Sequence, residues 1–288
     1  MSGLILRLHE KSGYDGHMNR YVAAALCAAS LLFLSPLAAE AQGPFHLSPA
    51  LDYGLGAGGA GLLSFDILYS KVLDKDDGID GYAVRDKDDV WAFDRWAMHD
   101  HDKAMDTAST ASMYATAAFP LIFFAAPKED WATIYAMYAE TVFLSQGVKE
   151  FTKAFVDRDR PYMYYEGAPS SKLEDGDYHD SFFSGHATTS FAAATFTSYV
   201  FCKEFPGSKW KIPVIAASYA LATTTAALRV AGGSHFLSDV LVGAAFGSLT
   251  GWLVPYLHTL APPCKDKGGN DSFQIAASPF GITASLTF

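Results

Sequence analysis

Apolar residues gather along the chain in long blocks, and five of these blocks have the length of a membrane-spanning helix. A helix of about 20 residues crosses the hydrocarbon core of a bilayer. Small and weakly polar residues replace much of the leucine and isoleucine, which suits a tight bundle in lipid and equally a buried bundle in water. We favour the membrane because four blocks hold no charge over most of a span. The five blocks are residues 105–126, 130–155, 183–202, 212–230 and 236–257.

A sixth apolar block, residues 54–72, is rich in glycine and contains Asp66, and its pattern leaves open whether it spans a membrane or packs on the bundle. The predicted fold class is therefore all-α, a helical bundle of five to six membrane-spanning or core helices. After the last block, residues 273–288 alternate loosely and are rich in Ser, Thr, Ile and Phe. This pattern predicts a short β tail, a strand or hairpin, at the C-terminus.

The N-terminal region has the pattern of a secretory signal peptide. Arg20 precedes an uncharged stretch over residues 21–39, and Ala39-Glu40-Ala41 supplies the small residues of a cleavage site. An uncleaved anchor helix is the alternative. The predicted organisation is a signal peptide at 1–41, a helical domain at 42–260 and a C-terminal tail at 261–288.

Charge and cysteine content exclude several other classes of protein. With 21 basic and 31 acidic residues the net charge is −10, which argues against a nucleic-acid-binding surface but allows a local anion pocket. Cys27, Cys202 and Cys264 show no spacing typical of a zinc site, so a structural metal held by cysteines is not indicated.

Three short clusters of cationic, histidine and small residues lie at the ends of the predicted helices. The first runs from Lys153 to Arg160-Pro161, the second is Ser184-Gly185-His186, and the third contains Arg229, His235 and Asp239. A Ser-Gly turn at a helix N-terminus presents backbone N–H groups to a phosphate, and the cations add charged donors. Together the clusters predict a site for a tetrahedral oxyanion, stabilised by charge during phosphoryl transfer.

The spacing within the third cluster suggests how an imidazole could be activated. His235 and Asp239 are four residues apart and would share one face of a helix. An aspartate in that position can accept a hydrogen bond from one ring nitrogen and leave the other as a nucleophile. Arg158 lies close to Arg160 in sequence, but the Arg-Pro step selects Arg160, and we expect Arg158 to pair with aspartates.

The ordered patterns K-x6-RP, SGH and R-x5-H-x3-D resemble those of the type 2 phosphatidic acid phosphatase and vanadium haloperoxidase superfamily, in its bacterial membrane lipid phosphatase branch. Two positions depart from the family pattern: Phe183 stands where proline is usual and Leu228 where serine is usual. The resemblance implies that His235 attacks phosphorus to form a phosphohistidine, with Asp239 orienting it. It also implies that His186 protonates the leaving oxygen and later activates water, with neither metal nor cofactor. The phosphoryl oxygens would be held by Lys153, Arg160, Ser184, Gly185 and Arg229.

The expected function is a phosphatase that acts on a lipid phosphomonoester or diphosphate, with membrane lipids as surroundings and no nucleic acid as partner. A soluble exported acid phosphatase, a vanadate-dependent haloperoxidase and a scaffold with a decayed site remain alternatives. Residues 157–181 join the first two motifs and are acidic, whereas residues 203–211 contain three lysines. The positive-inside rule then predicts a bacterial inner-membrane protein whose active site faces the periplasm, with a soluble periplasmic protein as the alternative.

Overall fold

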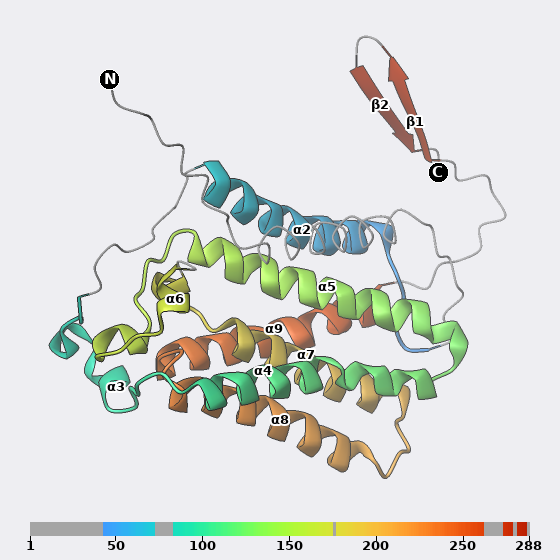
Figure 1. The fold of residues 1–288 in the computed structure, drawn as a ribbon. Coiled ribbons are helices and arrows are strands. Elements are labelled where there is room, and N and C mark those ends of the chain that lie inside the picture. The colour runs from blue at the N-terminus through green and yellow to red at the C-terminus, as the bar shows by residue number, and fades with distance from the viewer. Residues whose placement is uncertain (1–42, 73–82, 175–176, 262–272, 279–280, 287–288) are drawn as a thin grey trace, which may run out of the picture.

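The computed structural model describes residues 43–72, 83–174, 177–261, 273–278 and 281–286. Its long helices form one bundle, and a separate two-stranded hairpin ends the chain (Figure 1). The predicted signal peptide, residues 1–41, lies outside the described residues. The long helices are α2 (Pro49–Val72), α4 (Lys103–Ala117), α5 (Lys128–Lys153), α7 (Gly185–Glu204), α8 (Lys211–Ala231) and α9 (Leu237–Leu260). The shorter elements are η1 (Lys87–Asp89), α3 (Ala92–Arg95), η2 (Phe119–Ala125), η3 (Pro161–Tyr164), α6 (Ser170–Glu174) and η4 (Asp177–His179).

The all-α bundle is confirmed, and each apolar block predicted as a helix is helical. The first block differs in detail, because α4 ends at Ala117 and the chain continues as the 3-10 helix η2. Pro120 lies at the start of η2 and has no N–H to continue the α-helical ladder. The predicted tail is also present as β1 (Phe273–Ser278) and β2 (Gly281–Leu286), which pair antiparallel.

Helix α7 lies at the centre of the bundle, where it packs against α9, α8, α4 and α5 (Figure 1). An apolar core surrounds it towards the end of the bundle where α7 finishes. Phe196 and Val200 of α7 meet Ile134 and Met137 of α5 in this core, and all four are fully buried. Burial of each such side chain contributes about 1.5–3 kcal/mol. Helix α2 lies along the outer side of α5 (Figure 1).

Glycines let α9 approach α7 until their backbones touch. Gly243, Gly247 and Gly251 are spaced four apart on α9, so they form one stripe. A Cβ at Gly247 would lie 2.3 Å from the carbonyl oxygen of Thr188, and one at Gly251 would lie 2.4 Å from that of Ala192. This close contact fixes the start of α7 relative to the start of α9, where two of the three motifs lie.

Gly247→Ala is therefore expected to destabilise the protein by about 1–3 kcal/mol, because the added methyl group must separate two backbones. Gly58→Ala is the matched control, since Gly58 is exposed on α2 and a Cβ there would meet no atom within 4 Å. Thermal unfolding in detergent measures both. A melting temperature of Gly247→Ala equal to that of Gly58→Ala would contradict the close contact.

Three of the described helical segments are long and apolar enough to cross a membrane. They are Lys103–Ala125, Lys211–Ala231 and Leu237–Leu260, and only 22%, 22% and 39% of their apolar windows are buried inside the protein. Large side chains such as Phe124, Ile212 and Trp252 face outwards. Apolar surface of this extent needs lipid or another protein to cover it, which supports a membrane location.

Candidate active site

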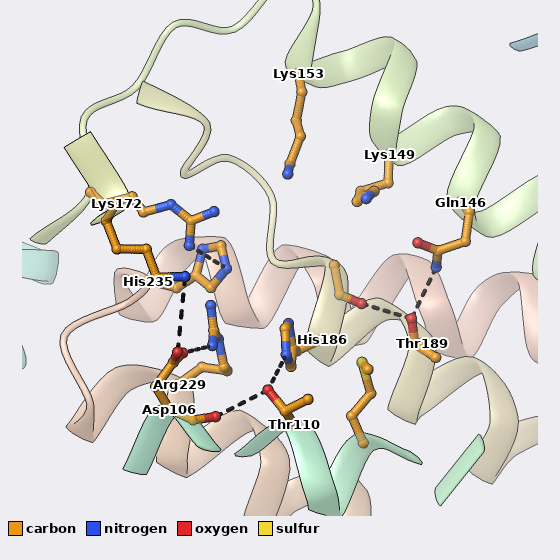
Figure 2. Close-up of a pocket in the computed structure, with 13 residues that line it drawn as sticks. Asp106, Thr110, Gln146, Lys149, Lys153, Lys172, His186, Thr189, Arg229 and His235 are labelled. Atoms are coloured by element: carbon orange, nitrogen blue, oxygen red, sulfur yellow. Dashed lines mark hydrogen bonds and ion pairs between the residues drawn. The ribbon is translucent and has the colours of Figure 1, made fainter. Parts of the chain in front are cut away.

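A pocket of about 360 Å³ opens at the end of the bundle where α5 and α8 end and α7 begins (Figure 2). Five cationic side chains and one carboxylate, that of Asp106, are among the groups that line it. This excess of positive charge makes the pocket a site for an anion. The five cations are Lys149, Lys153, Arg160, Lys172 and Arg229.

The cations reach the pocket from four different elements. Lys149 and Lys153 are one turn apart at the end of α5, and both extend towards the pocket (Figure 2). Arg160 precedes η3, and Arg229 lies in the last turn of α8; both are almost fully buried. A buried guanidinium group holds its donors in a fixed plane, which suits phosphoryl oxygens.

His235 lies in the short segment between α8 and α9, and its ring is held by a backbone group. Its Nδ1 is 2.8 Å from the carbonyl oxygen of Ser181. A carbonyl only accepts, so Nδ1 carries the hydrogen and Nε2 presents its lone pair. Nε2 lies 3.4 Å from Nη1 of Arg160, at the wall of the pocket.

The environment keeps this ring neutral. Burial, and then the positive charges of Arg160 and Arg229, hold the pKa of His235 well below its ordinary value of 6.5. The Nε2 lone pair is therefore available throughout the neutral pH range, as a nucleophile requires.

Asp239 supports His235 in a less direct way than the spacing predicts. Its Oδ2 is 3.8 Å from Nδ1 of His235, which is beyond hydrogen-bond distance. Instead Oδ2 accepts hydrogen bonds from the Ser181 hydroxyl at 2.6 Å and from the Phe236 N–H at 3.0 Å. Asp239 thus fixes Ser181, and the Ser181 carbonyl orients the imidazole.

The Ser-Gly-His turn begins α7, as the sequence predicts. Its first residue caps the helix, and the other two line the pocket. Ser184 is fully buried and caps the helix by accepting from the Ala187 N–H at 3.4 Å. Gly185 and His186 line the pocket, and a Cβ at Gly185 would lie 3.0 Å from Cδ of Lys149. Glycine at this position therefore leaves room for the Lys149 side chain.

His186 is positioned by helix α4. Its Nε2 lies 3.1 Å from the hydroxyl of Thr110, which donates to the Asp106 carbonyl oxygen at 3.1 Å (Figure 2). A hydroxyl has one hydrogen, so in this arrangement Nε2–H of His186 donates to Thr110. The contact holds the ring at the pocket wall.

Several pocket residues fall outside the three motifs. Asp106 forms an ion pair with Arg229 and accepts from the Ser234 hydroxyl at 3.0 Å. Gln146 donates to Thr189 at 3.0 Å. The sequence could have indicated Lys149 as a pocket residue, since it lies one helical turn before Lys153. The spacing of the motifs does not indicate that Asp106 of α4 would reach the pocket.

The two departures from the family pattern have different surroundings. Phe183 is buried, and its ring packs on Phe246 of α9 at 5.6 Å between centroids. Leu228 lies on α8, where its carbonyl accepts from the Gly232 N–H at the helix end. Neither residue lines the pocket.

Arg158 binds aspartates, as expected, and stands apart from the pocket lining. Its guanidinium group forms ion pairs with Asp94 at 2.7 Å and with Asp239, and it donates to the Ser238 hydroxyl at 2.9 Å. It also lies 4.3 Å above the Phe236 ring. Arg158 therefore joins α3 and α9 behind His235.

Arg160→Gln tests the electrostatic role of Arg160. We expect kcat/KM for phosphate release to fall about 10²-fold, because one charged donor to the developing oxyanion is lost. Loss of the cation also raises the pKa of His235 towards 6.5, so activity should decline at a higher pH on acidification than in the wild type. The pH profiles of the two proteins, recorded with one substrate, check both effects. If activity declines at the same acidic pH in both proteins, Arg160 does not affect the pKa of His235.

One family model matches part of this chain. The PAP2 superfamily model matches residues 131–262, a range that contains all three motifs, so the predicted resemblance is confirmed. A solved structure is also similar, that of the first transmembrane PAP2 type phosphatidylglycerolphosphate phosphatase from Bacillus subtilis. The two share 21% identity with a TM-score of 0.41, over 72% of this chain and 98% of that one. A search of curated proteins finds no match.

Proposed function

We propose that the chain is a phosphatase that hydrolyses a lipid phosphomonoester or diphosphate through a phosphohistidine at His235. The observation that carries the proposal is the position of His235, whose Nδ1–H is bound by a carbonyl while Nε2 borders a pocket with five cations. The match to the PAP2 superfamily supports the same reaction class.

In the first step Nε2 of His235 attacks phosphorus while the bond from phosphorus to the leaving oxygen breaks. Burial, and then the charge of Arg229, lower the pKa of His186 to about 3, and the negative charge of a bound phosphate would raise it again. The protonated His186 of this complex gives its proton to the leaving oxygen and the alcohol departs. Arg160, Arg229 and the lysines neutralise charge on the three equatorial oxygens in the transition state. The Gly185 N–H, at the first turn of α7, provides a further donor.

In the second step His186, now neutral, removes a proton from water. The resulting hydroxide attacks phosphorus, the P–N bond to His235 breaks, and inorganic phosphate leaves. His186 is again protonated and His235 neutral, so both groups return to their starting states. The chemistry uses imidazoles and fixed cations for tasks that a metal performs in other phosphatases.

A lipid substrate fits the surroundings of the pocket. Exposed aromatic side chains flank α3, at the same end of the bundle, with Trp91 and Trp96 65% and 74% exposed. Tryptophan is enriched where proteins meet the membrane interface. A phosphate headgroup at this level would reach the pocket while its acyl chains stay in the bilayer.

The proposed orientation places the pocket in the periplasm of a bacterial inner membrane. Lys203, Lys209 and Lys211 lie around the loop between α7 and α8, at the opposite end of the bundle from the pocket. Positively charged loops remain on the cytoplasmic side.

Phosphate release from purified lipids tests the function. Phosphatidate, phosphatidylglycerophosphate, a polyprenyl diphosphate and lipid A would be supplied in mixed micelles to the full chain, with and without EDTA. We expect release from at least one lipid, with an initial rate at low temperature that EDTA changes by less than about twofold, since no step uses a metal. Activity confined to soluble esters, or lost at once with EDTA, would overturn the proposal.

A further inference from the structure

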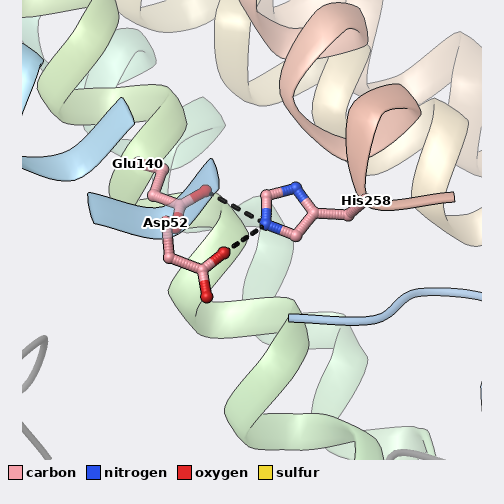
Figure 3. Close-up of side chains that lie close together, drawn as sticks. All are labelled: Asp52, Glu140 and His258. Atoms are coloured by element: carbon pink, nitrogen blue, oxygen red, sulfur yellow. Dashed lines mark hydrogen bonds and ion pairs between the residues drawn. The ribbon is translucent and has the colours of Figure 1, made fainter. Parts of the chain in front are cut away.

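A second cluster of titratable side chains joins three helices far from the phosphate pocket. Asp52 of α2, Glu140 of α5 and His258 of α9 converge on one point (Figure 3). His258 is 19 residues beyond Asp239 on the same helix, which at 1.5 Å per residue is about 28 Å along the axis. The cluster therefore has no part in binding the phosphoryl group.

Two carboxylates face the same nitrogen of His258. Nε2 lies 3.0 Å from Oδ1 of Asp52 and 3.4 Å from Oε2 of Glu140. The other nitrogen, Nδ1, is 2.9 Å from the carbonyl oxygen of Val254 and so carries a hydrogen. A backbone carbonyl that fixes one nitrogen and leaves the other towards carboxylates is the usual support of a metal-binding histidine.

The charges of the cluster balance only if one carboxylate is protonated or a further cation is bound. Glu140 and His258 are fully buried, and the Glu140 oxygens have no hydrogen-bond partner within the described part of the chain. Among the described residues, the ion pairs of both carboxylates go to His258 alone. With both carboxylates ionised, even a doubly protonated imidazole leaves one negative charge inside the protein, so without a further cation one carboxylate must take up a proton. A divalent cation would neutralise both carboxylates.

We propose that Asp52, Glu140 and His258 bind one divalent transition-metal ion of the zinc class, which clamps α2 to α5 and α9. The three ligand atoms lie within 4.8 Å of one another. Ligand atoms that share a tetrahedral ion at about 2.0–2.2 Å are roughly 3.3–3.6 Å apart. The 3.4 Å separation from Glu140 fits this range, and the 3.0 Å separation from Asp52 would lengthen slightly on binding. One imidazole nitrogen and two carboxylate oxygens are donors that suit Zn²⁺ or Mn²⁺ and not Cu(I). The side chain of Asp52 is 18% exposed, so water can reach a fourth coordination position.

Metal content and thermal stability test the clamp. The full chain, purified in detergent with its affinity tag removed, would be stripped with EDTA, equilibrated with Zn²⁺ and desalted. We expect about one zinc ion per chain, and a melting temperature that rises by about 5 °C or more on adding Zn²⁺. Glu140→Gln and His258→Gln should each bind less than about 0.2 equivalents and lose the shift. His235→Gln, which removes a buried histidine at the other end of the bundle, should still bind one.

A measurement on the wild type guards against variants that do not fold. Co²⁺ bound at the site should give visible d–d absorption, which one equivalent of Zn²⁺ abolishes. If the EDTA-treated wild type binds less than about 0.2 equivalents of zinc, the proposal is overturned. The cluster is then an imidazole that is hydrogen-bonded between two carboxylates. Zinc uptake that persists in both Glu140→Gln and His258→Gln also overturns the proposal. Neither readout uses phosphate release, so failure here is separate from failure of the proposed reaction.

Discussion

His235→Gln is expected to lower kcat for phosphate release by about 10⁴-fold or more, because it removes the nucleophile that would take the phosphoryl group. Glutamine approximates the size and polarity of the imidazole, so the melting temperature should change little. The residual rate would come from the cationic pocket, which still binds and polarises the phosphate. Initial rates with the preferred lipid, measured over a range of concentrations, separate kcat from KM.

Two further variants make this result specific. His99→Gln is the matched control, because His99 is an exposed histidine outside the pocket, and its rate should equal that of the wild type. His186→Gln, tested with an ester of a good leaving group, should accumulate an acid-labile phosphoenzyme, since the base for the second step is missing. A His235→Gln protein that keeps more than about a tenth of the wild-type kcat would rule out the phosphohistidine route.

The helices could be predicted from sequence because long apolar blocks are separated by polar loops and by prolines. The ends of these helices are less predictable from sequence, since they depend on local hydrogen bonding. Residues 105–126 look like one helix by hydrophobicity, yet Pro120 converts the second half to the 3-10 helix η2. Helix α2 has no clear end in its pattern, and its packing on α5 depends on Gly59 and Gly147, where the two backbones meet.

The three motifs predicted which residues would lie together, because their helix ends fall at one end of the bundle. The direct hydrogen bond expected between His235 and Asp239 is absent, and His235 Nδ1 contacts the Ser181 carbonyl oxygen in its place. Helix α9 begins at Leu237, so His235 precedes the helix and the i, i+4 geometry does not apply. Asp239 instead occupies the third helical position and caps the Phe236 N–H, while Ser181 takes over the contact with the ring.

Residues that meet only through tertiary packing could not be found from spacing. Asp106 is 123 residues from Arg229 in sequence, and its carboxylate reaches the pocket because α4 packs beside α8. The same holds for Asp52, which is 206 residues from His258. Contacts between residues so far apart in the sequence depend on how the helices pack, so the spacing of residues in a single sequence does not predict them.

The second large effect is expected from Arg158→Met, which should lower the free energy of unfolding by about 3–5 kcal/mol. Arg158 forms ion pairs with Asp94 and Asp239, and both carboxylates are fully buried. Methionine keeps part of the packing on Phe236 but leaves these two negative charges without a cation. Since Asp239 fixes Ser181 and so the ring of His235, kcat should fall as well, even at a temperature where the variant is folded.

Comparing Arg158→Met with two further variants separates the contribution of the Arg158 charge to stability from that of its packing. Arg158→Lys keeps a positive charge without the planar fork, so its stability should lie between those of the wild type and Arg158→Met. Arg158→Met combined with Asp94→Asn should recover part of the lost stability, because one of the two uncompensated charges is gone. Denaturant or thermal unfolding in the same detergent ranks all of them. If the double variant is no more stable than Arg158→Met, the loss comes from packing around Phe236, and the buried carboxylates do not depend on Arg158 for their charge balance.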